Sequence, residues 1–397
     1  MNPADSATSP PGQIPKALEL FCFAFCVGNA VWLGTAAMSG SWLWDPAGRL
    51  LSTDFLNVYA AGKLTLAGQA AAAYDWPTHK QMEIAVLGYD FGGYYGWHYP
   101  PFYLFIALTL ASLPYVPATL LWVAVSLVPY LAAMRAIVGS AAGFLLAFAM
   151  PSFLANVLVG QNGFLTAALI GGALYFLERR AVLAGICLGL LTYKPHFGIL
   201  FPVALIAGGY WRAIFSAFAT ALMLVLLSLL AFGPEPWLAF VKWLPVTSQT
   251  FLSEGRAEIE KMQSVFAIVR TLGGAEWLAW GLHAVFAAGV AVAIAAIWRD
   301  ARHPFALKAA ALATGVVLAT PYIYLYDTVV LAIPAAFLLR LGLAEGFRRH
   351  ELAGLGTAAL LLASFPFVKL PVGFAAAVIV AVLVARRLFE APRRAAT

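Results

Sequence analysis

Long apolar segments separated by short polar connections occupy most of this 397-residue chain. A transmembrane helix needs about 20 mostly apolar residues, because the hydrocarbon core of a bilayer is about 30 Å thick. The pattern predicts an all-α membrane protein, a single helical domain over residues 1–397 with about twelve transmembrane helices. The segments that reach or approach this length lie at about residues 20–38, 101–134, 139–158, 163–177, 181–193, 195–208, 213–232, 277–297, 305–320, 328–343, 352–366 and 371–385.

Two longer stretches interrupt this pattern, at residues 39–100 and 233–275. Both are predicted outer loops, where a site facing water has room to form. In the first, apolar residues recur at helical spacing, which predicts an amphipathic helix lying on the bilayer surface. These positions are Phe55, Val58, Tyr59, Gly62 and Leu66.

A second short helix is predicted in the first stretch from its end signals. Asp75 is a suitable N-cap, Pro77 fits the first turn, and Gly88 follows the last helical residue. Both tails, residues 1–15 and 391–397, are predicted to be disordered.

Composition supports a membrane protein and excludes several other classes. The chain is 62% hydrophobic and 11% charged, whereas about a quarter of the residues of a soluble domain are charged. The net charge of +6 comes from Lys and Arg scattered through short connections, so no nucleic-acid-binding face is predicted. Cys22, Cys26 and Cys187 lie in apolar segments without metal-ligand spacing, so neither a disulfide framework nor a metal site is expected.

The basic residues predict the orientation of the chain, because Lys and Arg are enriched in cytoplasmic loops. Both termini are then cytoplasmic in a multi-pass protein of the cell membrane, the bacterial inner membrane, and Gln161 and Lys194 lie on the outer side. Residues 102–159 must make two crossings and one piece that does not cross, and the sequence leaves open which piece this is. The main basic clusters lie at residues 179–180, 299–308, 340–349 and 386–394.

Several motifs in order resemble a known family. "TDFLNVYAAGKLTLAGQAAAAYD" is followed by "WHYPPFYLFIALTLASLPY", then by the block from Val159 to Ala213 that contains "GQNG" and "TYKPHF", and then by "MQSVFAIVRTLGG". This series, over residues 53–274, is similar to the GT87 (formerly DUF2029) family of polyprenol-phosphate-sugar-dependent membrane glycosyltransferases. The resemblance implies a GT-C fold and transfer of a sugar, with mannose the first candidate, from a polyprenyl-phosphate donor to a lipid or glycan acceptor. Its other expected partners are the membrane lipids, and it implies no cofactor.

The chemistry implied by the resemblance requires one carboxylate. Polyprenyl phosphate is a good leaving group, so an inverting transfer needs one base to take the proton of the acceptor hydroxyl. The resemblance assigns this role to Asp54 in "TDF". The alternative is that Asp54 is the N-cap of the helix that begins at Phe55.

A phosphate leaving group also requires a nearby cation. The resemblance assigns this role to Lys194, which is otherwise a helix anchor whose ammonium reaches the membrane surface. His196 and Arg270 are the further phosphate-binding candidates, although His196 equally fits a hydrogen-bonded structural histidine.

Seven further residues are predicted to contact the sugar or acceptor. Most have a structural alternative: capping for the polar residues at helix ends, and membrane-interface positions for the tyrosines. The late segment "ATPYIYLYDTVV" lacks the paired His that many family members carry there, which leaves the donor-phosphate role of that position in doubt. The seven residues are Tyr99, His98, Gln161, Asn162, Gln263, Tyr326 and Asp327.

Two other classes of function remain as alternatives. A transporter or flippase of a lipid-linked precursor would place polar groups near the bilayer midplane and often has paired halves. A non-catalytic envelope assembly protein would use the two outer stretches for docking. The polar residues gather instead near the outer helix ends, which favours an enzyme.

Overall fold

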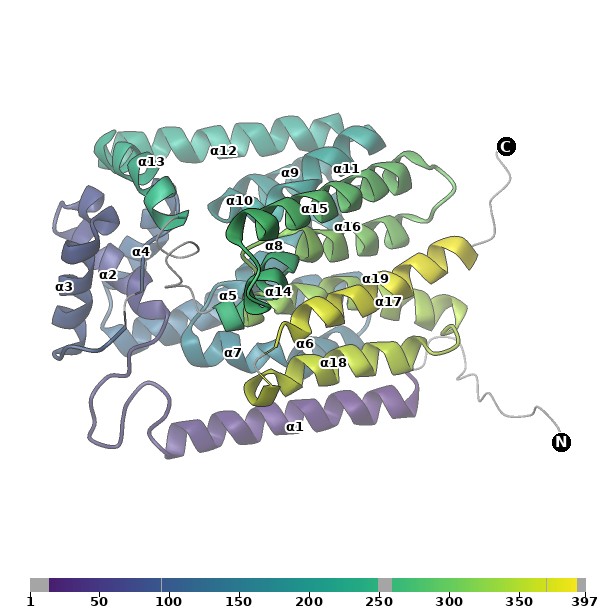
Figure 1. The fold of residues 1–397 in the computed structure, drawn as a ribbon, viewed down its shortest axis with the longest axis horizontal. Coiled ribbons are helices and arrows are strands. Elements are labelled where there is room, and N and C mark those ends of the chain that lie inside the picture. The colour runs from purple at the N-terminus through teal and green to yellow at the C-terminus, as the bar shows by residue number, and fades with distance from the viewer. Residues whose placement is uncertain (1–13, 94, 249–258, 369, 391–397) are drawn as a thin grey trace.

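The computed structural model describes residues 14–93, 95–248, 259–368 and 370–390, which are mostly helical (Figure 1). The predicted disordered tails lie outside the described residues, apart from Ile14 and Pro15. The first helices are α1 (Lys16–Met38), α2 (Phe55–Leu66), α3 (Trp76–Leu87) and α4 (Leu104–Ala111), with 3-10 helices η1 (Ala70–Tyr74) and η2 (Pro101–Tyr103).

The middle and last parts of the chain are equally helical, which confirms the all-α prediction for the described residues. The middle part comprises α5 (Tyr115–Val138), α6 (Ala142–Ala149), α7 (Ser152–Val159), α8 (Gly163–Phe176), α9 (Ala181–Leu190), η3 (Leu191–Tyr193), α10 (Pro195–Gly198), α11 (Leu200–Gly208), α12 (Trp211–Phe232) and α13 (Glu235–Ser248). The last part comprises η5 (Ile259–Lys261), α14 (Val265–Thr271), α15 (Glu276–Arg299), α16 (Phe305–Ala319), η6 (Leu325–Leu331), α17 (Ala332–Glu345), α18 (Glu351–Val368) and α19 (Val372–Glu390).

The described helices fit a multi-pass membrane protein. Seven are long and apolar enough to cross a bilayer: α1, α5, α12, α15, η6 with α17, α18 and α19. The bent pair α6 and α7 makes an eighth if it is one span, and five more helices are apolar but have only 10–17 residues. The count of twelve crossings therefore remains a prediction.

The segment between residues 102 and 159 contains one full-length helix, one bent pair and one short helix. Helix α5 has 24 residues, and α6 and α7 meet at an angle of 70°. Helix α4 has 8 residues, or about 12 Å at 1.5 Å per residue, so it is too short to cross the hydrocarbon core alone.

Helix α2 is confirmed as a helix, but its predicted position on the bilayer surface is wrong. Ten of its twelve residues are buried within the protein, including Asn57 on the side that was expected to be polar. Helix α4 covers it so closely that a Cβ atom at Gly62 would overlap the carbonyl group of Ala107. Helix α2 therefore belongs to the core, and its first residue, Phe55, is 0% exposed.

Helix α3 has the predicted ends. The Asp75 carboxylate accepts a hydrogen bond from the backbone N–H of Thr78 at 3.1 Å, and Gly88 ends the helix with a left-handed φ of 80°. Both ends could be predicted from the sequence, because a capping residue acts only on the helix end next to it.

The two stretches predicted as outer loops contain several short helices, and they pack together. Helix α13 lies against η1 and the start of α3, with Phe240 and Tyr74 ring centroids 5.8 Å apart and Trp243 and Trp76 centroids 6.0 Å apart. Figure 1 shows α2, α3, α4 and α13 gathered at one end of the bundle of long helices. We call this group the helical cap.

A buried acid–histidine pair lies inside the helical cap. His79 and Glu83 are both 0% exposed, one turn apart on α3, with Nε2 and Oε1 separated by 3.7 Å. Burial lowers the pKa of His79 to about 3, with a further contribution from His98. Burial raises the pKa of Glu83 to about 8, which the charge of Lys80 partly offsets. Both groups are therefore mainly neutral near pH 7.

We expect this pair to make stability depend on pH. Because folding raises the pKa of Glu83, the stability contributed by its protonated form is present below its unfolded pKa and is lost as pH rises towards 8. Because folding lowers the pKa of His79 from 6.5 to about 3, His79 affects stability only below about pH 6.5, where its contribution makes stability rise with pH. Between pH 6.5 and 8, Glu83 alone should lower the free energy of unfolding by roughly 2 kcal/mol.

Thermal unfolding of the detergent-solubilised protein across this pH range measures the effect. The Glu83→Gln variant should lose the dependence, whereas Glu19→Gln, at an exposed position, should keep it. Equal pH profiles for wild type and Glu83→Gln would show that Glu83 does not titrate in this range.

Candidate functional site

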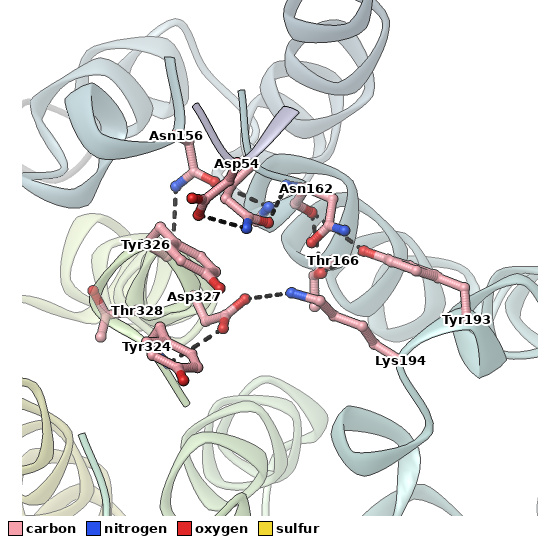
Figure 2. A network of polar contacts seen from close by, with 12 residues as sticks. Asp54, Asn156, Asn162, Thr166, Tyr193, Lys194, Tyr324, Tyr326, Asp327 and Thr328 are labelled. Atoms are coloured by element: carbon pink, nitrogen blue, oxygen red, sulfur yellow. Dashed lines mark hydrogen bonds and ion pairs between the residues drawn. The ribbon is translucent and has the colours of Figure 1, made fainter. Parts of the chain in front are cut away.

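Four segments far apart in the sequence meet beside the helical cap and bring polar side chains together (Figure 2). They are the start of α2, the turn between α7 and α8, the turn between η3 and α10, and the segment that leads into η6. Tyr99 joins them from the segment before η2. We call the polar residues that meet here the polar network. Its members are Asp54, Tyr99, Asn156, Gln161, Asn162, Gly163, Thr166, Tyr193, Lys194, Tyr324, Tyr326 and Asp327.

Asp54 occupies the N-cap position of α2, but its side chain makes no capping hydrogen bond. Its Oδ2 instead accepts a hydrogen bond from Gln161 Nε2 at 2.8 Å. The turn that carries Gln161 lies directly on α2, because Gly160 has φ +67° and a Cβ there would come within 2.7 Å of Phe55 Cβ. The capping alternative for Asp54 is therefore wrong, and its partly exposed carboxylate points towards the network.

Asn162, next to Gln161, is 1% exposed and forms hydrogen bonds with two tyrosines. Its Nδ2 donates to the Tyr99 hydroxyl at 2.7 Å, while its Oδ1 has no hydrogen-bond partner among the described residues. The Tyr193 hydroxyl donates to the Asn162 carbonyl at 3.2 Å and lies 2.6 Å from Thr166 Oγ1. The Oδ1 atom of Asn162 is thus a buried acceptor without a donor in the described part of the protein.

Asn156 fixes the turn and the η6 segment relative to each other. Its Nδ2 donates to the Tyr326 carbonyl at 2.8 Å and to the Ser152 carbonyl at 2.9 Å, and its Oδ1 accepts from Gly163 N at 2.9 Å. Asn156 is 0% exposed. Asn156 was not among the predicted site residues, although a lone Asn in the apolar helix α7 was an available signal.

Lys194 and Asp327 form a buried ion pair at the centre of the network. Lys194 Nζ and Asp327 Oδ1 are 2.7 Å apart, and the residues are 7% and 2% exposed. The Tyr324 backbone N–H donates to the second oxygen of Asp327 at 3.3 Å. Asp327 is thus the third residue of a capping box, rather than the N-cap that was one of its two predicted roles.

A second buried ion pair has a different hydrogen-bonding pattern. Arg387 donates to both carboxylate oxygens of Glu351, at 2.5 and 2.7 Å, and also to the Gly346 carbonyl at 3.0 Å. Lys194 has three N–H donors and one hydrogen bond, to Asp327, among the described residues. Arg387 therefore binds its carboxylate through two hydrogen bonds, whereas Lys194 binds Asp327 through one.

Two predicted ligand-binding residues form hydrogen bonds with the backbone, and their ligand-binding roles stay predictions. Gln263 Oε1 accepts from Gly373 N at 2.7 Å and its Nε2 donates to the Lys261 carbonyl at 3.1 Å. Arg270 donates to the Gly274 carbonyl at 3.0 Å, beyond the end of α14. The structure joins neither residue to the polar network by a hydrogen bond between side chains.

Three further predicted site residues, Tyr326, His196 and His98, make different contacts. The Tyr326 ring centroid is 5.5 Å from Lys194 Nζ. His196 is half-buried, and its carbonyl accepts from Thr320 Oγ1 at 3.3 Å. His98 packs parallel to Trp243 with ring centroids 6.5 Å apart, and burial lowers its pKa to about 4. The roles of these three residues stay predictions.

No cluster of three or more His, Cys, Asp or Glu side chains suited to a metal ion occurs in the described part of the chain. The network itself offers two carboxylates and one ammonium group. Such a set suits proton transfer beside an anionic leaving group. The expectation of a metal-independent reaction stays a prediction.

Comparison with protein families identifies the chain. The model of glycosyltransferase family 87 matches residues 97–321, which is more than half of the 397 residues. The chain belongs to this family. No curated protein and no solved structure matches it.

Membership in family 87 makes the protein a membrane glycosyltransferase. The matched residues include Asn156, Gln161, Asn162 and Lys194, but Asp54 and Asp327 lie outside them. The structure brings both carboxylates to the matched part of this glycosyltransferase.

We expect Asn156→Leu to destabilise the glycosyltransferase, because it would leave two buried backbone groups, Gly163 N and the Tyr326 carbonyl, without a partner. The cost should be about 2–5 kcal/mol. Thermal unfolding in detergent measures it, with Asn29→Leu as the control, since the Asn29 hydrogen bond to the Phe148 carbonyl is exposed. Equal losses in both variants would contradict the special role of Asn156.

Proposed function

We propose that this protein transfers a sugar, with mannose as the first candidate, from a polyprenyl-phosphate donor to a hydroxyl of a lipid-linked or envelope glycan. The reaction takes place on the outer side of the cell membrane and inverts the anomeric configuration. One observation carries the proposal: Gln161 holds the carboxylate of Asp54 at 2.8 Å, away from a capping role, in the same network as the buried ammonium of Lys194.

The proposed step needs one base and one phosphate-binding cation. The acceptor oxygen forms a bond to the anomeric carbon as its proton passes to Asp54. The bond between that carbon and the phosphate oxygen breaks, and the electron pair leaves with polyprenyl phosphate. Asp54 becomes a neutral acid, and the phosphate gains the negative charge that Asp54 loses.

The position of Asp54 suits a general base. Hydrogen bonding from Gln161 orients one carboxylate oxygen, and the residue is partly exposed whereas Gln161 and Asn162 are buried. An acceptor from the aqueous side reaches such a group before it reaches the rest of the network. The unsatisfied Oδ1 of Asn162 supports a role for that residue in binding a sugar hydroxyl.

The surroundings of Lys194 suit a phosphate. The ammonium group lies 5.5 and 5.6 Å from the ring centroids of Tyr326 and Phe197, in an apolar setting that strengthens charge interactions. Its unused N–H donors can bind phosphate oxygens while the bond to Asp327 remains.

An apolar cavity supports a lipid-linked donor. It has a volume of about 390 Å³ and lies between α1, α18, α17 and the α6–α7 bend. One part is lined by Pro151 and Leu331, and Leu331 is four residues beyond Asp327. An isoprenoid chain that extends from the phosphate site can use this space, whereas a soluble nucleotide sugar would leave it empty.

Replacement of Asp54 by Asn tests the proposal. We expect sugar transfer from polyprenyl-phosphate mannose to fall by about 10²–10⁴-fold, because an amide cannot accept the hydroxyl proton. The measurement is radiolabelled transfer in membranes that contain matched amounts of each protein. Asp90→Asn is the control, because this exposed carboxylate lies in the same stretch and should transfer normally.

Unchanged transfer by Asp54→Asn would refute the proposed base. Absence of transfer by wild type with mannose, followed by success with another polyprenyl-phosphate sugar, would change the sugar and keep the mechanism. A non-catalytic assembly role predicts no transfer with any donor and normal envelope assembly with Asp54→Asn.

A further inference from the structure

The charge balance of the polar network raises a question about phosphate binding. Asp54 and Asp327 contribute two negative charges, and Lys194 contributes one positive charge, so the network carries a formal charge of −1 when both carboxylates are ionised. Figure 2 shows the Asp327 carboxylate directed at the Lys194 ammonium, with Asp54 in the same group of polar residues. A site built only to attract phosphate would not place a carboxylate 2.7 Å from its cation.

Asp327 is held too firmly to be a temporary occupant that the phosphate displaces. It is 2% exposed, and one oxygen contacts Lys194 while the other accepts from Tyr324 N. The same residue closes the capping box of η6. The carboxylate therefore stays beside Lys194 when a ligand binds to the remaining N–H donors of the ammonium.

The reaction changes the charge of the phosphate group. The donor is a phosphodiester with one negative charge. The product is a phosphomonoester whose second ionisation has a pKa near 6, so it carries nearly two negative charges at pH 7. A fixed carboxylate repels the product about twice as strongly as the donor, since Coulomb energy is proportional to charge.

We propose that Asp327 discriminates between the donor and the spent polyprenyl phosphate. Its carboxylate sits beside the only cation of the described network, weakens binding of the dianion more than binding of the monoanion, and thereby promotes product release. This inference rests on the proposed function, because it takes a polyprenyl-phosphate sugar as the donor.

Two probes of equal chain length isolate the effect of charge. Farnesyl phosphate represents the product, and farnesyl methyl phosphate represents the singly charged donor. Their dissociation constants are measured directly on wild-type protein and Asp327→Asn in nanodiscs at pH 7.5. A displaced Lys194 would weaken binding of farnesyl phosphate more than binding of the singly charged probe, so it would shift the ratio in the direction opposite to the one expected for removal of the Asp327 charge.

We expect Asp327→Asn to shift this ratio by about tenfold or more in favour of farnesyl phosphate, as one charge removed at a separation of several Å implies. The shift should shrink at pH 5.5, where the monoester also carries a single charge. Competitive inhibition of sugar transfer by farnesyl phosphate should strengthen in parallel. Asp90→Asn, with its exposed carboxylate, should leave the ratio unchanged.

An unchanged ratio would overturn the inference and leave Asp327 as a positioning residue for Lys194. If Asp327→Asn does not fold, Asp327→Ser is a second neutral variant that keeps an oxygen for Tyr324 N. Sugar transfer with an unchanged ratio refutes the inference alone. Failure of wild type both to transfer the sugar and to bind farnesyl phosphate refutes the proposed function as well.

Discussion

The buried ion pair between Lys194 and Asp327 determines how the site is arranged. A charge inside an apolar helical bundle is costly unless a partner of opposite sign is held next to it. This requirement joins the turn before α10 to η6, segments 133 residues apart in the sequence, with 2.7 Å between the charged atoms. The η6 segment is also joined to α7, where Asn156 donates to the Tyr326 carbonyl.

The helical cap provides the other side of the site. Helix α2 is enclosed by protein, and this fixes the direction in which Asp54 leaves its N-terminus. The close contacts at Gly62 and Gly160 allow no side chain larger than hydrogen without a shift of the neighbouring backbone or of Phe55. The catalytic candidate is therefore placed by packing around α2, and its partner Gln161 lies 107 residues away in the sequence.

The charged residues of the site lie in two kinds of surroundings, one partly exposed and one buried. Asp54, the proposed base, is partly exposed, whereas Lys194 and Asp327 are almost fully buried. A nearby apolar cavity extends towards α1 and α18. The proposed transfer between a polar acceptor and a lipid-linked donor would use both kinds of surroundings.

The sequence by itself determined the helical membrane architecture, the limits of α3, and the candidacy of Asp54 and Lys194, because apolar length, capping signals and ordered motifs are local properties. It misplaced α2, because periodicity reports an apolar stripe and does not reveal that α4 covers the other side. It also left open whether Asp54 was only a cap and missed the bridging role of Asn156. Tertiary structure alone decided that Asp327 neutralises Lys194 and that Gln161 binds Asp54, because these contacts join distant segments whose buried polar groups must satisfy one another.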